Sequence, residues 1–469
     1  MSRVLTGLWQ VADMERDGRE LDPVQASRAM EPYVAAGLTA FDMADHYGSA
    51  EVIAGALPRE GRDVQMLTKW VPKPGAVTRD DVREAIELSL ERLQADAIDL
   101  LQFHAWNYHD LSYLDCLQHL QALRDEGLIR HLGLTNFDTA HLRVVVESGI
   151  EVVSNQVSHS LVDRRAAGAM AEYCEGRGVK ILAYGTLLGG FLSDRWLDAP
   201  EPSEGDLATW SQAKYKRFID AAGGWDAFQR VLRAAADVAK PLGASIANVA
   251  SRFILDSPGV GGVIVGARLG ESEHVDDTLR MLALDLDDEA RASIAAAIEG
   301  LTPVPGDCGD EYRKPPFLTA SGDLSHHLET FPAAFAPIEA GPDRTRVSSG
   351  TEWERLAGYS RAVRDGRRIL VSGTTASHGN RTIGGDDPAA QTHFVLDKIA
   401  AAVESLGGRW EDIVRTRVLV RDVSQWEPVA RAHGERFADV LPANTLVEAK
   451  LVATDALVEI EAEAMVQER

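Results

Sequence analysis

VQMLTKWVPKPGAVTRDDVREAIELSLERLQADAIDLLQFH, residues 64–104, holds two short apolar runs on either side of an amphipathic segment. The runs are VQMLTKW (64–70) and AIDLLQFH (97–104), and both are apolar almost throughout, as parallel strands covered on both faces should be. Residues 79–95 between them have the period of a helix, with an apolar face made of Val82, Ile86, Leu90 and Leu93. The stretch therefore predicts a parallel strand–helix–strand unit.

The same alternation runs through the first 300 residues. Further strand-like runs are TGLWQV (6–11), LTAFDMA (38–44), HLGLTNF (131–137), VVSNQV (152–157), VKILAYG (179–185) and GGVIVGA (261–267). Helical patterns cover 111–126, 138–148 and 164–177. Eight strands alternating with helices predict an α/β protein with a closed (β/α)8 TIM barrel. A doubly wound sheet is the alternative, but no GxGxxG follows an early strand.

Three further segments complete the chain. Residues 186–260 separate strands seven and eight, with helical stretches near 225–239 and 245–256, and are either a substrate lid or a solvated insertion. Residues 301–345 are proline-rich and lack periodicity, which predicts a partly extended linker. Residues 346–469 predict a compact α+β domain, with strands at 368–376, 412–420, 444–452 and 457–466 and helices at 387–406 and 424–439.

Composition restricts the classes of partner. The chain has 469 residues and a formal net charge of −24, which disfavours nucleic acid and anionic membrane surfaces. Its three cysteines lie far apart, so we expect neither a disulfide framework nor a metal site. The N-terminus lacks signal-peptide features, and no apolar run is long enough to cross a membrane. We expect a cytoplasmic protein.

Four polar residues fall where predicted strands end. Asp42 and Tyr47 lie in FDMADHYG, Lys69 in LTKW and His104 in LLQFH. Strand ends converge on the catalytic face of a barrel, so these side chains should meet. This set suits carbonyl reduction: a tyrosine donates the proton, an ammonium lowers its pKa, a carboxylate holds the ammonium, and an imidazole orients the carbonyl. Considered one at a time, each of these four residues could have an ordinary structural role in place of a catalytic one.

These segments resemble the catalytic segments of the aldo-keto reductase superfamily across the whole first domain. The resemblance implies that Tyr47 is the general acid/base, tuned by Lys69 and Asp42, and that His104 orients the carbonyl. It implies a nicotinamide cofactor whose carboxamide meets Thr135, Asn136 and Gln156. It also implies that Tyr184 stacks on the nicotinamide ring. Further cofactor contacts would come from Gly185, Leu187 and Gly189 at the pyrophosphate, and from Gly266, Ala267, Arg268 and Asp277 at the adenosine end.

The choice between NADP and NAD depends on Arg268. Its guanidinium suits a 2′-phosphate, but the residues that follow, LGESEHVDDT, are acidic. The resemblance implies NADP, with NAD as the alternative. Near the same strand ends, aromatic residues would wall a substrate pocket or pack in the core: Trp9, Trp70, Trp106 and Tyr108.

Residues 347–469 resemble the Rid (YjgF-like) family of reactive-intermediate deaminases. The resemblance implies a trimer with clefts between subunits, and places Tyr359, Ser372, Asn444 and Glu461 in the cleft. Active members bind a substrate carboxylate with an arginine in a Pro-Ala-Arg motif, but this chain has Pro442-Ala443-Asn444. Because an asparagine lacks the cationic fork of arginine, we expect a different, neutral ligand or a purely oligomerising module.

Two functions follow for the whole chain. The first is an NAD(P)-dependent oxidoreductase that interconverts a carbonyl and an alcohol, with a second domain that oligomerises it or processes a related intermediate. The alternative is a cofactor-binding sensor with little turnover. All four candidate catalytic residues are present, which favours the enzyme.

Overall fold

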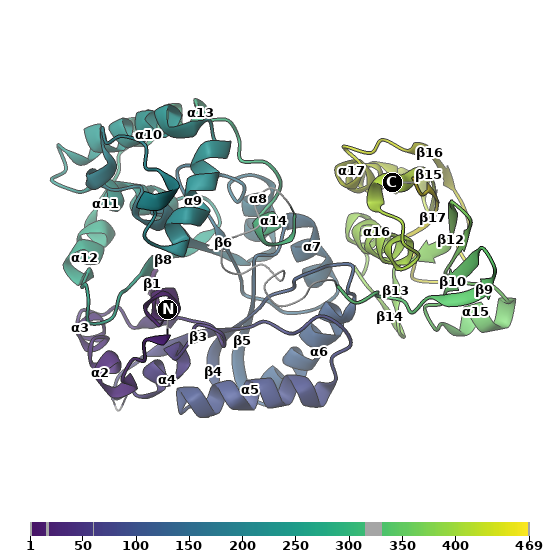
Figure 1. Ribbon diagram of the computed structural model, residues 1–469, viewed down its shortest axis with the longest axis horizontal. Helices are drawn as coiled ribbons and strands as arrows, with labels where there is room; N and C mark the ends of the chain where they lie inside the picture. Colours follow the sequence, from purple (N-terminus) through teal and green to yellow (C-terminus); the bar gives the residue numbers. More distant parts are fainter. Residues whose placement is uncertain (1, 16–17, 60, 315–330, 468–469) are drawn as a thin grey trace.

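The protein is described by a computed structural model over residues 2–15, 18–59, 61–314 and 331–467. The N-terminal part of these residues forms a closed barrel of eight parallel strands, in the order β1 to β8 (Figure 1). The strands are β1 (Val4–Gly7), β2 (Ala40–Asp42), β3 (Gln65–Trp70), β4 (Ile98–Phe103), β5 (Ile129–Thr135), β6 (Ser154–Ser158), β7 (Lys180–Tyr184) and β8 (Val260–Gly266). β1 pairs with both β2 and β8, which closes the barrel and confirms the predicted (β/α)8 fold.

Helices surround the barrel. They are α1 (Trp9–Met14), α2 (Pro23–Arg28), α3 (Glu31–Ala35), α4 (Ala50–Gly55), α5 (Arg79–Leu93), α6 (Ser112–Asp125), α7 (Thr139–Glu147), α8 (Ala169–Arg177), α12 (Val275–Ala283) and α13 (Asp288–Glu299). In α5, Thr78 and Asp81 form a capping box, and the predicted apolar face is buried. A small interior core fills the barrel: Leu5, Ala40, Leu67, Leu100 and Leu182.

The prediction of a strand at 6–11 is wrong in its bounds. β1 ends at Gly7, and Trp9 already begins α1. The apolar run TGLWQV spans both elements, and a short apolar run does not by itself distinguish a strand from a helix. The strand predicted at 444–452 is also wrong in its bounds, because the observed strand ends at Glu448.

The segment between β7 and β8 contains three α-helices within the described residues: α9 (Trp210–Ala221), α10 (Gly224–Ala239) and α11 (Ile246–Leu255). α10 packs against α11 and α13, and α11 packs against β8, so these two belong to the outer layer of the barrel. α9, which was not predicted, packs on the turn that follows β7. The segment is therefore an integral part of the barrel wall.

The C-terminal domain is built on a sheet in the order β16-β15-β17-β12-β11-β10-β9. Its strands are β9 (Ile338–Gly341), β10 (Arg344–Val347), β11 (Ala362–Asp365), β12 (Arg368–Thr375), β15 (Ile413–Val420), β16 (Ala443–Glu448) and β17 (Val458–Met465), with a separate pair β13 (Ser377–His378) and β14 (Arg381–Thr382). Its helices are α15 (Glu352–Ala357), α16 (Pro388–Ser405) and α17 (Trp426–Arg436). Asp387 caps α16 and Pro388 starts it, as predicted.

The predicted linker is partly ordered structure. α14 (Asp310–Arg313) lies within it, and β9 and part of β10 join the C-terminal sheet. Residues 315–330 of this prediction lie outside the described residues. The ordered elements contain no proline: Pro337 and Pro342 stand directly before and after β9, so a proline-rich composition does not exclude short elements between the prolines.

The two domains pack against each other through α7 and α16 (Figure 1). One continuous set of buried apolar side chains extends across this contact, and includes Val144 of α7 and Phe394 of α16. Each such fully buried side chain contributes about 1.5–3 kcal/mol. Among the described residues, no helix has the length and apolar character needed to span a membrane.

Candidate active site at the carboxyl ends of the barrel strands

The four predicted catalytic residues stand at adjacent strand ends. Asp42 ends β2, Lys69 lies in β3, His104 follows β4, and Tyr47 is in the loop after β2. Lys69 Nζ donates to Asp42 Oδ2 at 2.7 Å and to the carbonyl of Met43 at 2.8 Å. The same ammonium lies 5.0 Å from the centre of the Tyr47 ring. Parallel pairing of β2, β3 and β4 thus brings residues distant in sequence to one face of the barrel.

The protonation of Tyr47 differs from the expectation. Burial raises the pKa of Tyr47 well above its ordinary value, and the charge of Asp42 and the neighbouring Tyr312 add to that shift. The lowering effect predicted for the Lys69 ammonium is smaller than the effect of burial, so the net shift of the pKa of Tyr47 is upward. Burial lowers the pKa of Lys69 itself, with Asp42 opposing the shift, and the carboxylate balances the ammonium that would otherwise favour phenolate. Tyr47 is held in its protonated form, as a proton donor must be.

His104 is buried and neutral. Burial and the guanidinium of Arg313 hold the pKa of His104 well below its usual value. Its Nδ1 lies 3.3 Å from the carbonyl oxygen of Thr135. Because a carbonyl only accepts, Nδ1 carries the proton and Nε2 presents a lone pair. No described residue bonds Nε2, although the atom is buried. A lone pair on Nε2 can accept from a hydroxyl group, as in the alcohol form of a substrate, and the role of His104 in orienting the carbonyl stays a prediction.

The predicted carboxamide-binding residues lie together on β5 and β6: Thr135 ends β5, Asn136 follows it, and Gln156 lies within β6. Thr135 Oγ1 donates to the carbonyl of Gln156 at 3.2 Å, and Tyr184 OH donates to Asn136 Oδ1 at 2.8 Å. Gln156 Nε2 donates to Asp42 Oδ1 and to Gln102 Oε1, both at 2.7 Å. Within the described residues these bonds leave Asn136 Nδ2 and Gln156 Oε1 unused. One amide donor and one amide acceptor are the complement of a primary carboxamide.

The turn after β7 contains the residues predicted for the pyrophosphate. Gly185 and Gly189 have φ values of 71° and 64°, and Leu187 lies half-buried between them. A Cβ on Gly185 would come within 2.2 Å of the Tyr215 hydroxyl, so the turn requires glycine there.

At the adenosine end, Gly266 ends β8 and Ala267 and Arg268 follow it. Arg268 contacts two carboxylates, Asp13 at 3.0 Å and Glu271 at 2.9 Å. Asp277 lies in the first turn of α12, where its carbonyl accepts from Asn248 at 3.1 Å. The guanidinium predicted to bind a 2′-phosphate is therefore engaged by its acidic neighbours.

Two of the four predicted aromatic wall residues lie at the catalytic face. Trp9 packs edge-on against Tyr47 at 4.8 Å, and Trp106 packs edge-on against His104 at 4.6 Å, measured between ring centres. Trp70 and Tyr108 are only 7% and 6% exposed, which for these two residues favours the alternative of packing in the core. They point into the packed layer outside the strands, where Trp70 meets Phe103 and Tyr108 stacks on His141.

Sequence reasoning missed the residues that reach this face from other segments. Glu311, Tyr312 and Arg313 come from α14, inside the predicted linker, and Lys214 comes from α9. Tyr312 lies 5.6 Å from His104 between ring centres, and Arg313 Nη1 donates to the carbonyl of Asn136 at 2.6 Å. A four-residue helix in a proline-rich stretch has no periodicity that would reveal it.

The C-terminal domain places its predicted cleft residues apart within one chain. Asn444 Nδ2 donates to Thr416 Oγ1 at 2.9 Å, on the sheet face that carries α17. Glu461 pairs with Arg417 at 3.1 Å, one residue along β15 and therefore on the opposite face. Tyr359 and Ser372 lie near the β11–β12 pair, where Ser372 Oγ donates to the carbonyl of Ser360. A cleft containing all four would need more than one chain.

A cavity of about 260 Å³ opens beside Asn444. It is lined by Val418, Val429, Ala430, His433, Gly434, Phe437, Leu441, Pro442, Asn444 and Leu446. Thr416 connects its two polar groups, because its hydroxyl lies 2.9 Å from both Asn444 Nδ2 and His433 Nε2. Burial lowers the pKa of His433 to about 4, so the lining carries no charge at neutral pH.

The barrel and its strand-end site define a TIM-barrel oxidoreductase. Residues 3–299 match the model of the Aldo/keto reductase family, and residues 350–466 match the model described as Endoribonuclease L-PSP. The first match covers well over half of the chain. The chain therefore belongs to the aldo/keto reductase family and carries a Rid/YjgF (L-PSP) domain at its C-terminal end. This membership supports an oxidoreductase of the carbonyl and alcohol class.

Relatives match one part of the chain or the other. Protein tas of Escherichia coli is 26% identical over 323 residues, which cover 60% of this chain and 90% of the relative. An uncharacterized protein of Streptomyces coelicolor is 38% identical over 120 residues, 25% of this chain and 90% of the relative. The structure of a glycerol dehydrogenase from Gluconobacter oxydans shares the fold, with a TM-score of 0.54 and 23% identity over 66% of this chain and 94% of that one.

Proposed function

We propose that the barrel interconverts a small carbonyl compound and the corresponding alcohol with a nicotinamide cofactor, NADP by family precedent or NAD. The observation that carries the proposal is the buried Asp42–Lys69 pair, 2.7 Å apart, with its ammonium 5.0 Å from the ring of Tyr47. A packing role for Tyr47 would not require a buried ion pair beside it, since such a pair is costly to desolvate.

In this proposal the cofactor supplies or accepts a hydride at the reacting carbon. Tyr47 donates its phenolic proton to the oxygen as negative charge develops there, and its raised pKa keeps that proton in place until then. The Lys69 ammonium stabilises the phenolate that results, and Asp42 keeps the ammonium charged and oriented. In the alcohol direction the same phenolate takes the proton back.

The residues around the strand ends fit the cofactor. Asn136 Nδ2 and Gln156 Oε1 offer a donor and an acceptor for the carboxamide, and the glycines after β7 allow the backbone close to a pyrophosphate. Arg268 would contact the adenosine end. Its existing ion pairs weaken the case for NADP over NAD, since a 2′-phosphate would have to compete with two carboxylates.

The first test is titration of the purified protein with NADPH and, separately, with NADH, followed by tryptophan and cofactor fluorescence. Saturable binding of one or both is expected, followed by turnover of short aldehydes. Tyr47→Phe should retain binding and lose turnover, because only the proton donor is removed. Unchanged turnover in Tyr47→Phe would overturn the role of this residue. Cofactor binding without turnover in the wild type would favour the sensor.

For the C-terminal domain we propose assembly of the chain into a trimer and binding of a small neutral molecule beside Asn444. The uncharged lining of the 260 Å³ cavity supports the second part. Benzamide and benzoate differ in charge and little in shape, so their affinities for the wild type and for Asn444→Arg test it. The wild type should prefer benzamide, and the variant should prefer benzoate. Sedimentation equilibrium tests the trimer.

A further inference from the structure

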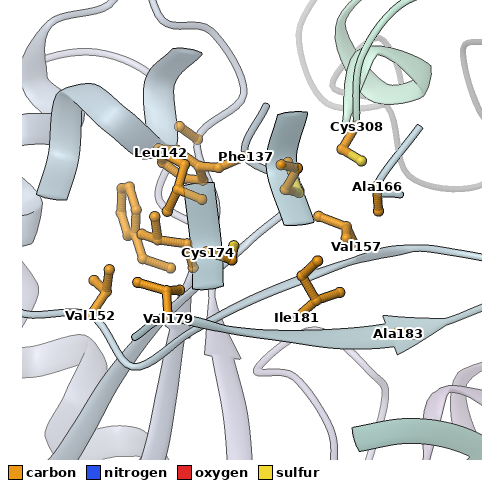
Figure 2. Close-up of a cluster of buried hydrophobic side chains, with 14 of the residues drawn as sticks. Phe137, Leu142, Val152, Val157, Ala166, Cys174, Val179, Ile181, Ala183 and Cys308 are labelled. Carbon is orange, nitrogen blue, oxygen red and sulfur yellow. The ribbon is translucent and has the colours of Figure 1, made fainter. Parts of the chain in front are cut away.

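The cavity beside Asn444 interrupts the apolar packing of the C-terminal domain. In the barrel, Cys308 is fully buried and reaches toward Ala166 at the edge of a cluster of apolar side chains (Figure 2). In the C-terminal domain, buried Phe437 instead borders a cavity of about 260 Å³ between α17 and β16. Pockets for drug-sized ligands measure about 300–1,000 Å³, so this cavity suits a smaller molecule. Apolar lining that faces water forgoes about 25 cal/mol of stabilisation per Å².

Gly434 leaves one wall of this cavity without a side chain. It lies in α17, on the helix face where Ala430 and Phe437 also line the cavity. A Cβ on Gly434 would meet nothing within 4 Å, and its φ lies outside the left-handed region, so the fold does not require glycine there. Glycine inside a helix costs about 0.5–1 kcal/mol relative to alanine. The missing side chain therefore serves the cavity and not the helix.

Leu441 lines the cavity in an unfavourable backbone conformation. Its φ is 49°, in the left-handed region, which costs a non-glycine residue roughly 1–2 kcal/mol. Leu441 is also 80% exposed, so contacts of its side chain within the chain do little to offset that strain. An apolar ligand in the cavity would cover this side chain.

The polar groups of the cavity form a chain with two different ends. Asn444 Nδ2 donates to the Thr416 hydroxyl, which then donates to Nε2 of neutral His433, each at 2.9 Å. His433 Nδ1 therefore carries the ring proton, and Asn444 Oδ1 keeps its lone pairs. No described residue bonds either atom. If the chain ran in the other direction, His433 would accept and Asn444 would donate. Either direction leaves one donor and one acceptor, on opposite sides of the Thr416 hydroxyl.

We propose that this cavity binds a primary or secondary carboxamide with a small apolar body. The N–H and C=O of the ligand pair with the two ends of the chain Asn444–Thr416–His433, and its apolar part lies between Gly434 and Leu441. A carboxylate or an ester lacks the N–H and satisfies one end alone. This inference rests on the ligand site proposed for the C-terminal domain and names the class of ligand.

The test compares N-methylbenzamide with methyl benzoate, which has nearly the same shape but an oxygen in place of the N–H. Calorimetry on the full chain should show that wild type binds the amide about fivefold to tenfold more tightly, the effect of one additional hydrogen bond. Thr416→Val breaks the chain and should bring the two affinities within about twofold. Thr392→Val is the matched control and should keep the preference, because Thr392 is equally buried but its hydroxyl bonds the carbonyl of Pro388 within α16.

A second variant tests the cavity without disturbing the core. Gly434→Leu fills the cavity and should lower the affinity for both ligands at least tenfold, while the temperature of thermal unfolding stays the same or rises. Gly176→Leu is its control and should leave both affinities unchanged. Gly176 lies in α8 of the barrel, and a Cβ there also meets nothing within 4 Å.

The outcomes separate the class of ligand from the site. Equal affinities for amide and ester in wild type, both lowered by Gly434→Leu, would keep the ligand site and overturn the amide class. Binding of neither ligand by wild type would overturn the site as well. Affinities that Gly434→Leu and Thr416→Val leave unchanged would place the amide elsewhere in the chain, which also overturns the inference.

Discussion

Asp397 of α16 accepts a hydrogen bond from His141 of α7, with Oδ2 and Nε2 3.0 Å apart, across the interface between the two domains. Neither side chain is more than 5% exposed. The other ring nitrogen of His141 lies 2.7 Å from Asp138, and the other oxygen of Asp397 lies 2.6 Å from Arg436. Both nitrogens of His141 face carboxylates, so both donate and the ring is an imidazolium. Asp138, His141, Asp397 and Arg436 thus form a buried chain of alternating negative and positive charges at the interface.

Removing one member of this chain should destabilise the protein strongly. Asp397→Asn leaves two buried cations facing a neutral amide, and we expect a loss of about 3–5 kcal/mol in the free energy of unfolding. Urea denaturation measures it. Asp115→Asn is the control, because Asp115 also crosses the interface, to His378 and Arg381, but is 38% exposed. Asp115→Asn should lower the free energy of unfolding by about 1 kcal/mol or less. Equal losses in Asp115→Asn and Asp397→Asn would contradict the importance of burial.

The interface should weaken at alkaline pH. Burial acts to lower the pKa of His141, but Asp138 and Asp397 outweigh it and hold the pKa above its ordinary value. The stabilisation is therefore complete below about pH 6.5 and is lost as the pH rises through the folded-state pKa. His141→Gln should flatten this dependence in urea denaturation between pH 6 and pH 9.5. His131→Gln, an exposed histidine on β5, should not. A slope that is the same in all three proteins would refute the assignment.

The pH dependence of kcat/KM should change when Asp42 is replaced, because Asp42 helps to keep Lys69 protonated. Burial lowers the pKa of Lys69 and Asp42 opposes that shift, so Asp42→Asn should let the pKa fall further. Lys69 then loses its proton at lower pH, and the alkaline limb of kcat/KM should move to lower pH with a loss of about 100-fold in the maximum. Asp99→Asn is the control, since Asp99 caps the far end of the neighbouring strand through Met66 N. An unmoved alkaline limb would exclude Asp42 from tuning Lys69.

Cofactor preference should respond to the carboxylate that engages Arg268. Glu271→Gln removes one of the two carboxylates paired with Arg268, the one 2.9 Å from Nε, so that a 2′-phosphate competes with Asp13 alone. We expect the affinity for NADPH to rise severalfold while that for NADH is unchanged, as measured by fluorescence titration at fixed ionic strength. Glu273→Gln, a neighbouring exposed carboxylate, serves as the control for net charge. A parallel change for both cofactors would mean that Arg268 does not contact the 2′ position.

The barrel was predictable because parallel strands buried on both faces leave a signal in short apolar runs. The convergence of Asp42, Lys69 and His104 followed from strand order alone, since each residue stands at the end of its strand. Errors occurred where one apolar run covered two elements, as at Thr6–Val11, and where short elements carry no period, as in α14. For Trp70 and Tyr108 the sequence left a pocket wall and core packing open, because a position near a strand end does not reveal the direction of a side chain.

The sequence by itself determined the order of strands and helices, the family of each domain and the candidates for the acid–base residues, because local periodicity and short motifs encode them. Only the tertiary structure decided that Tyr312 and Lys214 meet beside His104, and that Asp397 pairs with His141. These contacts join residues 98 and 256 positions apart, and no local pattern specifies them. Charge and hydrogen-bond complementarity act through space, so they become visible once the chain is folded.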